Sequence, residues 1–178
     1  MKQKSKSKII IFLIIAALAA SAAGIWYFSD FSSPEKRLNL SPDLRFNLYN
    51  SEELGFSFQY PPNFVISSFE EGEATIILAT ATSTDASFQI YITAFDEPGD
   101  MITAERVQQD IPDIIINDPQ EITIGGLAKG ISFISESPEG STSNSEIWFA
   151  HTGWLYQITA PLSDDTLLQR VLNMWKFE

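Results

Sequence analysis

The sequence of 178 residues contains no cysteine and only one histidine, His151. Without cysteine the chain has no disulfide, iron–sulfur cluster, thiolate metal site or cysteine nucleophile, and no thiol that could carry a lipid. With one histidine, multi-histidine metal sites are excluded, and a Ser/His/Asp triad would have to use His151. No Gly-x-Ser-x-Gly motif accompanies that histidine. A folded domain of this composition is held together by its core alone.

Positive charge is also scarce. The chain has 11 Lys and Arg against 23 Asp and Glu, and four of the lysines lie in residues 1–8, where there is no acid. An excess of negative charge repels phosphate backbones, so nucleic-acid binding is not expected, whereas basic partners and divalent cations are compatible with it. The simpler interpretation is that scattered surface acids keep a domain soluble.

Charge is absent from residues 9–28, an apolar run interrupted only by Ser21 and Gly24. As a helix this run would rise about 30 Å, which is enough to cross the hydrocarbon core of a bilayer. The lysines before it form a basic stub, and such stubs stay cytoplasmic. We therefore expect a single-pass signal anchor in the cell membrane, with the amino terminus in the cytoplasm and the rest of the chain extracytoplasmic.

The alternative for the same segment is a cleaved signal peptide, which would release a secreted protein. Ala20-Ser21-Ala22 has the small-x-small pattern that signal peptidases recognise. The chain remains apolar from Ile25 to Phe28, where a cleaved peptide usually becomes polar, and this favours the retained anchor.

Downstream of the anchor, the composition predicts a spacer and one domain. Residues 29–52 are rich in Ser, Pro, Asp and Asn and have no sustained period. Residues 53–178 suffice for one compact domain with its own core. Most of this domain shows the two-residue alternation of β-strands. Strands are expected at residues 55–60, 63–69, 74–79, 88–94, 122–124, 127–135, 145–151 and 154–160.

Two junctions give specific predictions of pairing. Residues 63–69 follow Pro61-Pro62 and are expected to form a hairpin with residues 55–60. If Thr152-Gly153 is a two-residue turn, His151 faces Trp154, and the pairs Phe149/Tyr156 and Ile147/Ile158 lie on the same face.

Two short amphipathic helices complete the expected elements. Ala104, Val107 and Ile111 recur at helical spacing before Pro112, with Asp100 or Thr103 as the cap. A second helix follows the capping segment 163–165 and carries an apolar stripe that ends at Trp175. Runs of strands with helices before and after predict an α+β domain with a curved antiparallel sheet flanked by helices.

Three segments resemble the PsbP-like (Mog/PsbP) fold family. They are Leu54-Gly55-Phe56-Ser57-Phe58-Gln59-Tyr60-Pro61, then Ile124-Gly125-Gly126-Leu127-Ala128-Lys129-Gly130, and finally Trp154-Leu155-Tyr156-Gln157-Ile158-Thr159, followed by a helix and Trp175-Lys176-Phe177. The resemblance covers essentially all of residues 53–178, and it departs at Phe64, where many relatives have tryptophan.

The resemblance implies an α/β/α sandwich like that of the small membrane-anchored bacterial proteins of unassigned role in this family. Because the family is largely non-enzymatic, it also implies an interaction or assembly module that binds another envelope protein, without a cofactor. The three segments contain no ligand site, so a photosynthetic role does not follow.

The acidic segments 96–100 and 110–113 are the candidates for chemistry. Asp96, Asp100 and Asp113 are weak candidate ligands for calcium, which prefers several oxygens from flexible loops. Neither segment has the spacing of an EF-hand, and acids beside Pro and Gly are usual in turns. The alternative function is therefore a calcium-dependent or hydrolytic envelope enzyme that uses these acidic loops.

Aromatic residues near the turn at Thr152-Gly153 are the second candidate site. His151, Trp154 and Tyr156 could form an exposed patch that binds a partner. Bulky rings at strand spacing more often belong to a core, and a histidine beside a hairpin turn more often sits at the rim of the fold, partly stacked on the neighbouring indole.

Overall fold

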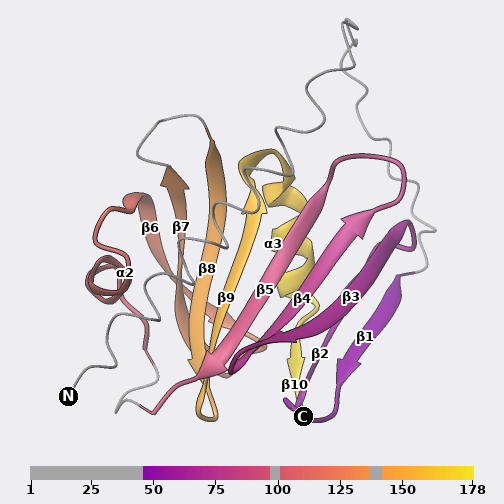
Figure 1. The fold of residues 1–178 in the computed structure, drawn as a ribbon, viewed down its shortest axis with the longest axis horizontal. Coiled ribbons are helices and arrows are strands. Elements are labelled where there is room, and N and C mark those ends of the chain that lie inside the picture. The colour runs from indigo at the N-terminus through magenta and orange to yellow at the C-terminus, as the bar shows by residue number, and fades with distance from the viewer. Residues whose placement is uncertain (1–45, 97–100, 137–141) are drawn as a thin grey trace, which may run out of the picture. The chain divides into compact units, whose positions relative to one another are not determined.

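The computed structural model describes residues 46–96, 101–136 and 142–178 (Figure 1). The chain divides into two units, Met1–Pro42 and Asp43–Glu178, and all described residues belong to the second. The predicted anchor at residues 9–28 and its basic stub lie outside the described residues. Among the helices of the described ranges, none has the length and apolar character needed to cross a membrane.

Seven antiparallel strands form the larger sheet, in the order β3-β4-β5-β9-β8-β7-β6 (Figure 1). Their bounds are Phe64–Glu71 for β3, Ala74–Ala81 for β4, Ser87–Ala94 for β5, Ile115–Ile124 for β6, Ala128–Glu136 for β7, Ser143–His151 for β8 and Trp154–Pro161 for β9. The predicted strands at 74–79, 88–94, 127–135, 145–151 and 154–160 are confirmed, because their apolar and β-branched side chains pack on one or both faces of the sheet.

Strand β6 begins seven residues before the predicted strand at 122–124. The residues Asn117-Asp118-Pro119 are of the kind that forms turns. In the structure they lie within β6, at an irregularity where the register with β7 shifts between Asn117 and Gln120. Asp118 takes a positive φ of 49° at this point. A bulge of this kind ends pairing locally without ending the strand.

Three further strands form a smaller sheet in the order β1-β2-β10. They are β1 (Asn47–Ser51), β2 (Phe56–Tyr60) and β10 (Lys176–Phe177). The predicted hairpin between residues 55–60 and 63–69 is wrong: β2 pairs with β1 and β10, and β3 pairs with β4. β1 also lies within residues 29–52, the range expected to be a spacer.

The first core lies between the larger sheet, the smaller sheet and helix α3 (Asp165–Asn173), which follows a short 3-10 turn, η1 (Leu162–Asp164). Leu168 and Val171 of α3 are fully buried here, as the apolar stripe predicts. The aromatic rings of β2 stack on Trp175, with centroids 4.6 Å apart for Phe56 and 5.4 Å for Phe58. Burial of these large rings is the main apolar contribution to this side of the fold.

The second core lies on the opposite face of the larger sheet, beneath helix α2 (Ala104–Asp110). Val107 of α2 packs there with residues of β7, β8 and β9 that alternate with those of the first core, namely Ile131, Phe133, Trp148, Ala150 and Leu155. The helix begins after Thr103, whose hydroxyl accepts the N–H of Arg106, and ends at Ile111 before Pro112, as predicted.

The turn between β8 and β9 is confirmed with its predicted register. Thr152 and Gly153 have φ of 46° and 83°, which gives the positive φ at both central positions that a type I′ hairpin requires. His151 pairs with Trp154 and Phe149 with Tyr156. The rings of the second pair stack with centroids 4.7 Å apart, so the aromatic pairs lie on the face of the first core.

Candidate functional site

The acidic residues proposed as calcium ligands are only partly described. Asp96 is exposed just after β5, Asp113 is exposed in the loop after α2, and Asp100 lies outside the described residues. Over residues 46–96, 101–136 and 142–178, no three His, Asp or Glu side chains are grouped so that they could hold a metal ion. The calcium site therefore stays a prediction.

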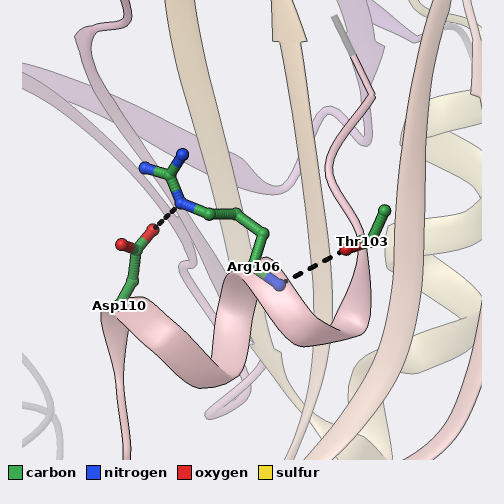
Figure 2. A network of polar contacts seen from close by, with 3 residues as sticks. All are labelled: Thr103, Arg106 and Asp110. Carbon is green, nitrogen blue, oxygen red and sulfur yellow. Dashed lines mark hydrogen bonds and ion pairs between the residues drawn. The ribbon is translucent and has the colours of Figure 1, made fainter. Parts of the chain in front are cut away.

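Helix α2 lies between these two acids in the chain, and two of its charged side chains pair with each other (Figure 2). The Nε of Arg106 lies 3.0 Å from a carboxylate oxygen of Asp110, one helical turn away. The guanidinium also lies over the ring of Phe95, 5.4 Å from its centroid. The hydroxyl of Thr103 accepts the backbone N–H of Arg106 at 3.3 Å and so caps the helix. Asp110 is thus engaged in an ion pair within the helix, and the guanidinium of the same pair contacts Phe95, the residue after β5.

The three residues of the predicted aromatic patch do not form one exposed surface. Tyr156 is fully buried in the first core, and its hydroxyl donates to the carbonyl of Leu54 at 3.4 Å. Burial raises the pKa of Tyr156 to about 12. His151 is half-buried at the rim, but its ring packs 3.9 Å from that of Phe177 in β10, whereas stacking on Trp154 was expected. Trp154 packs partly buried against the same core.

A buried carboxyl on the opposite face of the sheet is the chemical feature that the sequence reasoning missed. Glu146 lies on β8 and is 7% exposed. The hydroxyl of Ser135 on β7 donates to its Oε1 at 2.8 Å, and the hydroxyl of Thr159 on β9 donates to its Oε2 at 2.7 Å. One carboxyl therefore connects three neighbouring strands through their side chains, in addition to the backbone ladder.

Burial is the main cause of the raised pKa of Glu146. Loss of hydration disfavours the charged form and raises the pKa to about 7, against the opposing effect of the hydroxyls of Thr159 and Ser135, which favour the carboxylate. The indole N–H of Trp148, two residues along β8, also favours the charged form, although it falls short of hydrogen-bond geometry. Near neutral pH this carboxyl binds and releases a proton inside the sheet.

Two sequence features point to Glu146 once the register is known. It is a charged residue in a strand whose next four residues, 147–150, are all apolar or aromatic. It also shares a strand face with Trp148, which is buried. A carboxylate on a buried face requires partners, and small hydroxyl residues on adjacent strands supply them at low steric cost.

No protein-family model and no curated protein matches the chain. Among solved structures, the chain is similar to the solution structure of cyanobacterial PsbP (CyanoP) from Synechocystis sp. PCC 6803. The TM-score is 0.56 at 10% sequence identity, and the match covers 82% of this chain and 100% of that chain. The chain has a PsbP-like fold.

The segments that carry the sequence resemblance occupy structural positions in this PsbP-like fold. Residues 54–61 contain β2, the centre of the smaller sheet, and residues 124–130 contain the tight turn between β6 and β7. Residues 154–159 lie in β9, the middle strand of the larger sheet. Gly130 is also structural, because a Cβ there would lie 2.6 Å from the Cβ of Phe149. The likeness therefore concerns the packing of the fold.

Proposed function

We propose that the chain is a membrane-anchored, extracytoplasmic interaction module that binds or stabilises a basic envelope component without catalysing a reaction. The observation that carries the proposal is the charge of the folded unit. Residues 46–178 contain 20 Asp and Glu but only four Lys and Arg. A field of this sign attracts basic surfaces and gives contacts that weaken as salt is added.

Three of these four cations are engaged by the chain's own residues, so they offset the acidic surface only locally. Arg106 pairs with Asp110, Lys129 donates to the hydroxyl of Thr123 at 2.6 Å, and the guanidinium of Arg170 lies 5.8 Å from the ring centroid of Phe46. The excess of acids over cations in residues 46–178 favours a partner that supplies the positive charge.

The location in the proposal rests on the sequence before the folded unit. The basic stub at residues 1–8 and the uncharged run at 9–28 support an anchor with the amino terminus in the cytoplasm. The experiment is extraction of membranes with alkaline carbonate, followed by mass spectrometry of the amino terminus. An intact chain that resists extraction supports the anchor, and a soluble chain that begins near Ala23 contradicts it.

The interaction role is tested by cross-linked pull-down of the tagged full-length chain from intact envelopes at low and high salt. A stoichiometric partner whose capture falls at high salt is the expected result. The variant with Asp96, Asp100 and Asp113 all changed to Asn separates this proposal from the calcium-dependent or hydrolytic alternative. The variant should bind the partner nearly as well as the natural chain. If the triple variant folds but has lost the function of the natural chain, the proposal of a non-catalytic assembly module is wrong in this form.

A further inference from the structure

In the described ranges the two sheets have four edge strands, and β3 is the longest of them that pairs without interruption. β10 has two residues and β1 has five, which leaves a short ladder in each case. β6 is longer, but Pro119 and the irregularity at Asp118 interrupt it. Short strands, prolines and bulges are the usual protection of sheet edges.

The remaining edge, β3, has none of these protections. It pairs with β4 without interruption over eight residues, contains no proline, and has β4 as its only strand neighbour in the described part of the chain. Every side chain from Ser67 to Glu71 is exposed, on both faces of the strand. Val65 and Phe69 point to one face and are 55% and 49% exposed. A long, regular edge with exposed apolar side chains is a template for a further strand.

The sequence of β3 is complementary to itself in one antiparallel register. If Ser67 of one copy faces Ser67 of a second, then Val65 faces Phe69 in both directions, and residues that face each other share a side of the sheet. We propose that two copies of this chain pair through β3 in this register, about a two-fold axis at Ser67. The paired Val65 and Phe69 extend an apolar stripe that begins at Ile76 on β4, beside Phe69.

Charge within this register does not oppose a second copy. Glu70 faces Phe64 and Glu71 faces Asn63, so no two acids of the two strands oppose each other. The hydroxyl of Thr75 donates to both carboxylate oxygens of Glu70, at 3.0 and 3.1 Å, which holds this charge toward β4 and away from the open edge. An extended basic peptide is the other occupant that this edge could take, and the experiment separates the two.

The absence of cysteine makes the pairing directly testable in the full-length chain, purified in a non-denaturing detergent. The test variant is Ser67→Cys, because identical residues at a two-fold axis have Cβ atoms about 4.5–5.5 Å apart, within reach of a disulfide or a short bis-maleimide. The control is Ser83→Cys, the same substitution at an exposed position in the loop after β4. Both variants keep the N-terminal segment, so dimers formed through that segment affect them equally.

We expect Ser67→Cys to form a cross-linked dimer at least about tenfold faster than Ser83→Cys at micromolar chain concentration. Adding Phe69→Lys to Ser67→Cys should slow the reaction by about tenfold, because it removes two apolar pairs about the axis. Leu127→Lys is the matched control, since Leu127 is 66% exposed and lies far along the chain in the turn after β6. Circular dichroism establishes that each variant is folded.

Equal cross-linking rates for the two cysteine variants would overturn the proposal. A cross-linking rate of Ser67→Cys that Phe69→Lys leaves unchanged would also overturn it. A folded Ser67→Cys chain that stays monomeric while it cross-links to a different protein in envelopes would identify the edge as a site for another chain. These outcomes are independent of the pull-down, which reads salt-dependent capture of a basic partner.

Discussion

At the residue scale, Glu146 carries the most informative chemistry in the described part of the chain. Its carboxyl ties β7, β8 and β9 together through two hydroxyl groups, yet burial disfavours its charged form. This position could be predicted from sequence only in part. The charged residue in an apolar strand is visible, but its hydroxyl partners lie 11 and 13 residues away and become neighbours only through the register of three strands.

Glu146→Gln should change how stability depends on pH. The pKa of Glu146 is about 7 in the folded chain and near 4.5 when exposed, so the folded chain retains a proton that the unfolded chain has released. Below about pH 4.5 the carboxyl is protonated in both states, so its ionisation does not affect stability. As pH rises from about 4.5 through 7, the buried carboxyl lowers the free energy of unfolding increasingly. Glutamine stays neutral, so the free energy of unfolding of the variant relative to the natural chain should rise by up to about 3 kcal/mol between pH 4.5 and pH 8.

Urea titrations at several pH values measure this difference, with the exposed Glu121→Gln as the control. Burial also raises the pKa of Asp164, but this group is present in both chains and cancels in the comparison. Parallel pH profiles for the natural chain and Glu146→Gln would show that the carboxyl is not buried as the structure has it.

At the element scale, local pattern predicted strands and helices well and predicted their distant partners poorly. The hairpin at Thr152-Gly153 was correct because a two-residue turn fixes the register by itself. The hairpin after Pro61-Pro62 was wrong because β2 finds its partners at residues 47–51 and 176–177. One partner lies in a polar segment and the other has two residues, so neither carries a periodic pattern that the sequence could reveal.

Trp175 is one of the side chains that join the smaller sheet to the first core, and it does so through aromatic contacts. Its ring stacks on Phe56 and Phe58, while its indole N–H has no hydrogen-bond partner in the described residues. Trp175→Phe should therefore cost only about 1 kcal/mol of unfolding free energy, because it keeps a ring in the stack. Trp175→Ala should cost about 3–5 kcal/mol, because it leaves a large cavity.

The comparison is made by urea unfolding followed by circular dichroism, which does not depend on the fluorescence of the mutated residue. The Phe variant is the matched control for the Ala variant. Equal losses for the two would mean that the indole N–H, and not the stacked ring, stabilises this position.

At the scale of the whole molecule, repulsion between acidic side chains opposes the stabilisation that the two cores provide. Apolar burial on both faces of the larger sheet stabilises the domain, while 20 acids against four cations in residues 46–178 repel one another. The same excess that would attract a basic partner therefore weakens the isolated fold. A partner that neutralises the surface would stabilise the domain as it binds, since anything that binds only the folded state shifts the unfolding equilibrium.

Salt should accordingly stabilise the free chain at neutral pH. Raising the ionic strength from about 0.01 M to about 1 M shortens the screening length from about 30 Å to about 3 Å, and we expect the unfolding free energy to rise by about 1 kcal/mol. The double variant Glu52→Gln/Glu53→Gln removes two adjacent exposed acids and should respond less to salt. Urea unfolding at each ionic strength measures both. If salt lowered the stability of the natural chain, attractive ion pairs would dominate its surface, and the case for a basic partner would lose its electrostatic basis.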